Sequence, residues 1–129
     1  MRVRVEVHEY TMTSWIVQGV LREAERRKAK RVTEVQIVIG ELTFLNPDQV
    51  RFWYDILTKD TVMDGSRLII EIEPGRVKCP KCGYEGRIRC DENPLYHIMI
   101  PTLLCPKCNG IAEIQGGRDC IIKSIRLVV

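Results

Sequence analysis

Two nearly identical short segments, CPKCG at 79–83 and CPKCN at 105–109, constrain the fold of this chain more than any other part of the sequence. Two cysteines separated by two residues can direct both sulfur atoms at one tetrahedral ion, and two such pairs complete a closed shell. Gly83 and Asn109 follow each second cysteine and tolerate the left-handed conformation that such turns often need. The spacing therefore predicts a structural zinc site, with iron as the alternative metal because tetrahedral sulfur suits both. The predicted ligands are Cys79, Cys82, Cys105 and Cys108.

The stretch around these cysteines, 77–118, is rich in cysteine, proline and glycine and lacks long apolar periodicity. A module of this size is too small to be stabilised by a hydrophobic core of its own and needs a cross-link such as a bound metal. Structural zinc contributes on the order of 10–16 kcal/mol in small modules, which is enough to fold this one. A closed four-cysteine shell has no open coordination position. The metal is therefore predicted to stabilise the fold and not to catalyse hydrolysis.

The rest of the sequence predicts two helices and three strands. An amphipathic helix is expected at 12–28, where apolar residues recur every three or four positions. Asn46, as N-cap, and Pro47, in the first helical position, mark the start of a second helix. Strands are expected where apolar residues alternate or run together, at 32–42, 66–75 and 120–129.

These elements predict an α+β fold with a small mixed sheet and two helices. A first domain is expected to combine residues 1–76 with 119–129, and a four-cysteine zinc-ribbon module is expected at 77–118. We expect the C-terminal strand to return to the sheet of the first domain. Cys90 and Cys120 lie outside the zinc pattern, and each is expected to be a buried apolar cysteine, with a bridge between them as the alternative.

The charge and hydropathy of the chain exclude several classes of protein. The 20 basic and 17 acidic residues are interspersed, unlike the concentrated charge of a nucleic-acid-binding face. The RRKAKR run at 26–31 is expected to complement the C-terminal end of a helix. No segment has the eighteen or so apolar residues of a membrane span, and the N-terminus lacks the apolar core of a secretory signal. We therefore expect a cytoplasmic protein with reduced thiols.

His8, in the segment VEVHEYT, permits two interpretations. Valines at 3, 5 and 7 alternate with charged residues, which predicts a strand that ends near His8. Imidazole is also a common transition-metal ligand, so His8 is a candidate metal ligand. No phosphate-binding glycine loop and no nucleophile with an obvious base are visible, so no enzymatic activity is predicted.

Several distinctive segments follow one another in a fixed order. They are a His-Glu pair, an amphipathic helix, a strand ending in IGEL, a second helix, a further strand and CxxC-x22-CxxC. This order resembles that of the HypA/HybF family, the nickel-insertion accessory proteins of [NiFe]-hydrogenase maturation. The resemblance covers about Val7 to Val129. Many proteins contain a zinc ribbon, but VHEYTMTSWIV followed by RVTEVQIVIGEL is more specific to this family.

The resemblance implies a nickel site in addition to the structural zinc. His8 would be the essential nickel ligand, and Glu9 would contribute its backbone or its carboxylate. His97 is expected to be a surface histidine, with the role of an additional nickel ligand as the alternative. Family members begin Met-His-Glu, whereas six residues precede Val7 here. Either these residues form an added edge strand, or position 7 is the true initiator and the chain then begins with methionine.

The resemblance also implies partners. The chain would be a metallochaperone that works with the GTPase HypB and passes nickel to the hydrogenase large subunit, with urease accessory proteins as alternative partners. It would be a monomer or a strand-exchanged dimer. A zinc-ribbon protein that binds nucleic acid or the ribosome is the main alternative, supported by the pI near 8.6. A redox protein that uses one CxxC pair is a third, which the two matched pairs disfavour.

Overall fold

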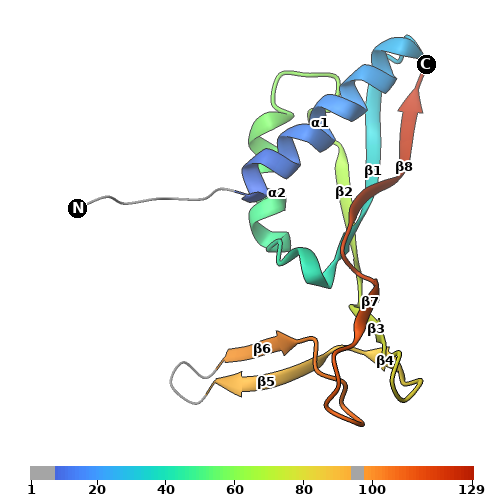
Figure 1. Cartoon of the computed structure of the whole chain (residues 1–129). Coiled ribbons are helices and arrows are strands. Elements are labelled where there is room, and N and C mark those ends of the chain that lie inside the picture. The colour runs from blue at the N-terminus through green and yellow to red at the C-terminus, as the bar shows by residue number, and fades with distance from the viewer. Residues whose placement is uncertain (1–7, 94–97) are drawn as a thin grey trace. The chain divides into compact units, whose positions relative to one another are not determined.

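The computed structural model of the chain describes residues 8–93 and 98–129 (Figure 1), which form two compact units. The first unit contains residues 8–39, Phe44–Glu71 and Cys120–Val129. The second contains Gly40–Thr43 and Ile72–Asp119. The predicted edge strand at 1–6 lies outside the described residues, as does His97.

The first unit contains two helices and a three-stranded sheet in the order β2-β1-β8. Its elements are α1 (His8–Arg26), β1 (Arg31–Gly40), α2 (Pro47–Leu57), β2 (Arg67–Glu73) and β8 (Cys120–Val128). β2 runs parallel to β1 (Figure 1), and β8 pairs with β1 antiparallel, so the sheet is mixed. The predicted α+β fold and the return of the C-terminal strand are confirmed.

The core of the first unit lies between the sheet and the two helices. In β1, Val35, Ile37 and Ile39 alternate with less buried residues and are at most 1% exposed. The helices complete this core through apolar residues at helical spacing, including Val17, Val20, Val50 and Tyr54. Because every second residue of a strand faces the same side, β1 presents one apolar face to both helices.

The ends of the two helices differ in how well the sequence predicts them. α2 begins as expected, with the Asn46 side chain accepting hydrogen bonds from the N–H groups of Asp48 and Gln49. α1 begins at His8 and not at residue 12. The interpretation of His8 as the end of a strand is therefore wrong, because the alternation of the first seven residues does not continue past Val7.

The second unit is built from short strands. β3 (Arg76–Lys78) pairs with β4 (Glu85–Arg87) and β7 (Glu113–Gly116), and β5 (Arg89–Asn93) pairs with β6 (Ile98–Thr102) in a separate antiparallel hairpin. A one-turn helix, η1 (Glu41–Thr43), belongs to this unit. Gly40 lies against the backbone of Gly117, where a Cβ atom would collide with the carbonyl group.

Candidate functional site

The two CPKC segments fold into turns with the same hydrogen bonds. In the first, the N–H of Gly83 donates to the carbonyl oxygen of Cys79 at 2.9 Å, and the N–H of Cys79 donates to the carbonyl oxygen of Tyr84 at 2.7 Å. In the second, Asn109 and Gly110 make the equivalent bonds with Cys105, also at 2.9 and 2.7 Å. Gly83 has φ +78° and Asn109 has φ +61°, so both turns close through a left-handed residue. The two turns are therefore local repeats of one conformation.

The turns bring four sulfur atoms together. The Sγ atoms of Cys79 and Cys108 lie 3.6 Å apart, as do those of Cys82 and Cys105, and all four lie within 4.8 Å of one another. Four sulfurs at about 2.3 Å from a tetrahedral ion would be separated by about 3.8 Å, so this arrangement fits one zinc-sized ion. Cys79 and Cys105 are fully buried, whereas Cys82 and Cys108 are exposed.

The electrostatics of the cluster require a cation if all four thiols are to ionise. The backbone N–H of Cys82 donates to the Cys79 sulfur and lowers its pKa to about 7. Burial alone would raise the pKa of Cys105, but N–H groups in its own turn outweigh burial and lower it. The N–H of Tyr84 lowers the pKa of Cys82, but desolvation and the neighbouring thiols raise it to about 11. One sulfur thus ionises at the expense of another, and a divalent cation would remove that competition.

His8 and Glu9 form the start of α1, at the surface of the first unit. His8 is exposed and is the first residue of the helix. The Glu9 carboxylate accepts a hydrogen bond from the backbone N–H of Asn46 at 3.1 Å. Asn46 therefore serves both helices, because its side chain caps α2 while its backbone holds Glu9. The sequence indicated the cap but not the contact with Glu9, which joins residues 37 positions apart.

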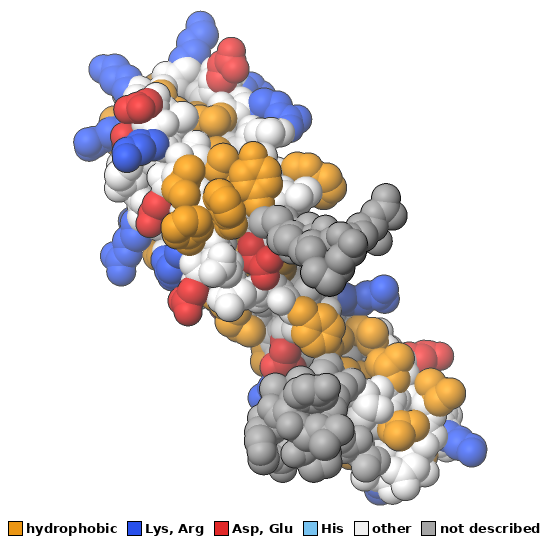
Figure 2. Space-filling view, turned by 90° about the vertical axis from the view of Figure 1, so that its left-hand side faces the viewer, with side chains coloured by type: hydrophobic (Ala, Val, Ile, Leu, Met, Phe, Trp, Pro, Cys, Tyr) orange, Lys and Arg blue, Asp and Glu red, His pale blue; other side chains and the backbone are white. Residues whose placement is uncertain are grey.

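An aromatic cluster lies next to the Glu9 turn. The ring of Tyr10 packs edge-on against Trp53 with centroids 5.0 Å apart, and Phe52 packs edge-on against Trp53 at 5.1 Å. Tyr10, Phe52 and Ile56 are 42%, 53% and 48% exposed, and hydrophobic side chains gather on the face of the first unit shown in Figure 2. The hydrogen bond of Glu9 to Asn46 and the packed rings thus hold the start of α1 against α2.

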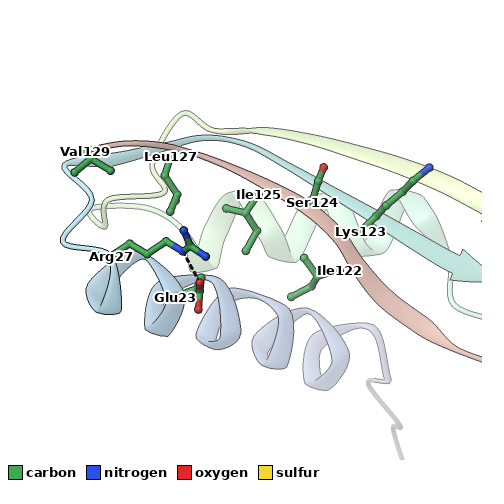
Figure 3. A pocket seen from close by; sticks show the side chains of 8 residues that line it. All are labelled: Glu23, Arg27, Ile122, Lys123, Ser124, Ile125, Leu127 and Val129. Atoms are coloured by element: carbon green, nitrogen blue, oxygen red, sulfur yellow. Dashed lines mark hydrogen bonds and ion pairs between the residues drawn. The ribbon is translucent and has the colours of Figure 1, made fainter.

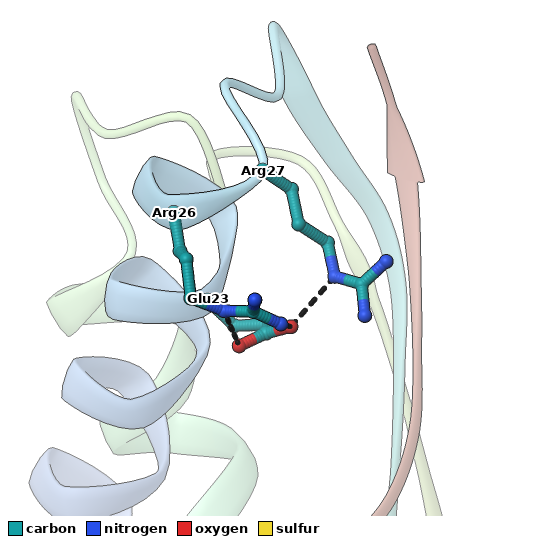
Figure 4. A network of polar contacts seen from close by, with 3 residues as sticks. All are labelled: Glu23, Arg26 and Arg27. Atoms are coloured by element: carbon teal, nitrogen blue, oxygen red, sulfur yellow. Dashed lines mark hydrogen bonds and ion pairs between the residues drawn. The ribbon is translucent and has the colours of Figure 1, made fainter.

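The first two basic residues of the run at the end of α1 donate hydrogen bonds to a glutamate of the same helix. The carboxylate of Glu23 accepts hydrogen bonds from Arg26, at 2.6 and 3.1 Å, and from Arg27, at 2.6 Å (Figure 4). Hydrogen bonds from Arg26 and then Arg27 lower the pKa of Glu23 to about 2. Arg26 lies in the last turn of the helix, where a cation complements the dipole. This position agrees with the helix-end interpretation of the run.

Cys90 and Cys120 lie outside the cluster, and the sequence predicts either that each is buried in a core or that they form a bridge with each other. Cys120 is half-buried against the core of the first unit, and burial raises the pKa of its thiol. It carries a free thiol, so the alternative of a bridge with Cys90 is wrong. The side chain of Cys90 lies outside the described residues.

No helix in the described part of the chain is long and apolar enough to cross a membrane.

The chain matches known proteins over almost its whole length. A family model described as "Hydrogenase/urease nickel incorporation, metallochaperone, hypA" matches residues 7–127. Hydrogenase maturation factor HypA of Methanothermobacter thermautotrophicus is 39% identical over 122 residues, covering 94% of this chain and 97% of that protein. The factor of the same name from Archaeoglobus fulgidus is 35% identical over 119 residues, covering 92% and 96%.

A solved structure shares the fold. The solution structure of the Ni metallochaperone HypA from Helicobacter pylori matches with a TM-score of 0.61 over 95% of this chain and 98% of that chain. At 18% sequence identity, this likeness concerns the fold alone.

Proposed function

Since the chain belongs to the HypA family of nickel metallochaperones for hydrogenase maturation, we propose that it delivers nickel to the large subunit of a [NiFe]-hydrogenase. The observation that carries this proposal is the exposed His8 at the first residue of α1, beside a Glu9 that is held in place by Asn46. A chaperone must bind its metal at the surface, where the recipient can take it. The start of α1 is such a place.

The chemistry of this helix start suits nickel. Imidazole is a good ligand for nickel, and square-planar nickel favours nitrogen donors. The N–H groups of a first helical turn have no acceptor within the helix, so backbone nitrogens next to His8 can enter a coordination shell without loss of a helical hydrogen bond. Glu9 would hold this turn at Asn46 through one carboxylate oxygen and contribute its backbone, or its second oxygen, to the site.

Nickel titration of single variants tests this assignment. His8→Ala is expected to lose tight nickel binding, and Glu9→Ala to weaken it. Glu25→Ala changes another glutamate of α1, one that is exposed, and is the control, for which no change is expected. Nickel affinity in His8→Ala equal to that of the wild type would refute the site. His97→Ala, measured beside them, would remove His97 from the site if affinity and geometry are unchanged.

We assign the four-cysteine cluster to structural zinc. The two buried and two exposed sulfurs would hold the ion, and its positive charge would keep all four thiolates ionised. All four positions would be filled by protein, so the ion would supply stability to the short strands of the second unit and no hydrolytic chemistry. Elemental analysis of protein made without added metal should give one equivalent of zinc. Less than half an equivalent of zinc or iron would refute the assignment.

The partners follow from the delivery of nickel. A HypB-type GTPase is proposed to act with the chain, and the hydrogenase large subunit is the proposed recipient. Urease is the alternative recipient, because the matching family model covers both systems. Transfer of bound nickel to a purified large-subunit precursor, compared with transfer to urease apoprotein, discriminates between them. A metallochaperone carries its metal stoichiometrically, so the chain is proposed to act by binding and release and not as an enzyme.

A further inference from the structure

The end of α1 and the turn after it carry more positive charge than the helix end requires. Residues 22–31 contain six basic and two acidic side chains, a net charge of +4, whereas the whole chain has a net charge of +3. All six basic side chains are exposed, and basic side chains gather at the upper end of the first unit in Figure 2. The helix dipole corresponds to about half a charge at this end, so it accounts for only a small part of the surplus.

Two of these six cations are already engaged by one carboxylate. Arg26 and Arg27 both pair with Glu23. Arg27 lies with Glu23 on the α1 side of a groove of about 570 Å³ that β8 borders (Figure 3). Within the part of the chain that the structure describes, the other four cations form no ion pair, and they are Arg22, Lys28, Lys30 and Arg31. The charge that remains available to a partner therefore lies on these four residues.

Lys28 occupies a backbone position that glycine usually fills. α1 ends in a Schellman motif, in which the N–H of Lys28 donates to the carbonyl oxygen of Glu25 at 3.0 Å and the N–H of Ala29 to that of Ala24 at 2.9 Å. Lys28 has φ +53°, a left-handed conformation that glycine adopts without strain and lysine does not. A lysine here keeps a positive charge at a cost in backbone strain, which indicates that the charge itself has a use.

A separate pocket of about 470 Å³ lies between α1 and the loop that follows α2. Four apolar side chains line it, and the charged side chains of Glu25 and Lys28 complete the lining. The apolar side chains are those of Leu21, Ala24, Ala29 and Val62. The strained lysine therefore lies directly beside an apolar pocket.

Lys30 and Arg31 lie close to the same pocket. They stand between Ala29, which lines it, and Val32, whose N–H donates to the carbonyl oxygen of Val62 at 2.8 Å. The loop 59–67, which carries Val62, contains two basic and two acidic residues and adds no net charge. The surroundings of the pocket are therefore positive.

We propose that this end of the first unit binds an acidic segment of a partner protein, with one apolar side chain of the segment in the pocket and its carboxylates on Lys28, Lys30 and Arg31. The apolar pocket favours a protein over a nucleic acid, because a phosphate backbone offers no apolar side chain. Residues 22–31 also contain no aromatic ring on which a base could stack. His8 is at the other end of α1, so the proposal does not depend on the nickel site.

A labelled peptide with one leucine flanked by glutamates on both sides is the probe, and fluorescence anisotropy with the full chain measures its affinity. Binding should be saturable and should weaken as salt concentration rises, because salt screens exposed charges. Two control peptides carry serine in place of the leucine or glutamine in place of the glutamates. Each should bind about tenfold more weakly. Absence of saturable binding, or equal binding of either control peptide, would overturn the proposal.

Variants of the chain locate the binding surface. Lys28→Glu and Arg31→Glu should each weaken binding of the probe by roughly three- to tenfold, whereas Lys28→Arg, which keeps the charge, should retain it. Val62→Ser should weaken binding of the leucine peptide and leave that of the serine peptide unchanged. Lys107→Glu makes the same charge change at an exposed lysine of the second unit and is the control, with no effect expected. Equal weakening by Lys107→Glu and Lys28→Glu would overturn the proposal.

Lys28→Gly separates binding from stability. It relieves the left-handed strain, so the thermal midpoint should rise by a few degrees, and it removes the charge, so binding of the probe should weaken. Unchanged binding in Lys28→Gly would overturn the proposal. So would a single-stranded oligonucleotide that binds more tightly than the peptide and equally well to Val62→Ser, because it would assign the surface to nucleic acid.

Discussion

Replacement of Gly83 by alanine isolates the backbone strain of one cysteine turn. Gly83 has φ +78°, and a Cβ atom added there would meet nothing within 4 Å. The left-handed conformation costs an ordinary L-residue about 1–2 kcal/mol, so this strain is the only cost of the substitution. Zinc binding and folding of a small metal module are coupled, which transfers the cost to the metal affinity. Gly83→Ala is therefore expected to weaken zinc binding by about 5–30-fold.

Competition with a chromogenic chelator measures this change directly. Gly65→Ala is the matched control, because Gly65 has φ +76°, also meets nothing within 4 Å, and belongs to the first unit. It should destabilise the first unit by a similar amount and leave the zinc affinity unchanged. Gly83→Asn should lose less affinity than Gly83→Ala, since Asn109 occupies the equivalent position at φ +61°. Wild-type zinc affinity in Gly83→Ala, or an equal loss in Gly65→Ala, would refute the reasoning.

Further substitutions at Glu23, Asn46, Ile37 and Val38 test the first unit. The Arg26 hydrogen bond is the largest cause of the lowered pKa of Glu23, so this stabilisation is complete above pH 4.5 and is lost as pH falls through about 2. The difference in thermal midpoint between wild type and Glu23→Gln should shrink over that range, and a constant difference would contradict the pairing. Asn46→Ala should cost about 1 kcal/mol of unfolding free energy in urea, and Asn46→Asp should cost little. Ile37→Ala should cost about 2–5 kcal/mol, and Val38→Ala on the opposite strand face much less.

The sequence predicted the elements whose signals are local. Asn46 and Pro47 marked the start of α2 because cap chemistry acts within one turn. The alternation of Val35, Ile37 and Ile39 predicted the buried face of β1. The four cysteines that spacing grouped together lie together, because each turn is closed by its own hydrogen bonds.

What the sequence did not predict depends on contacts between distant residues. The first turn of α1 is held by Glu9 on Asn46 and by the packing of Tyr10 on Trp53, and neither contact appears in a local window. The strands β3, β4 and β7 are only three or four residues long, too short to show an alternating pattern. Their pairing follows from the cysteine turns between them and not from β-propensity.

Asn46 gives its side chain to α2 and its backbone N–H to Glu9, so two independent requirements limit the residue at this position. Proline has no N–H to donate, and alanine has no side-chain acceptor. Aspartate, serine and threonine supply both groups, so among chains that keep this helix pair, position 46 should vary only within a short set of small polar residues. A substitution outside that set would remove the cap of α2, and proline would also release Glu9 at the start of α1.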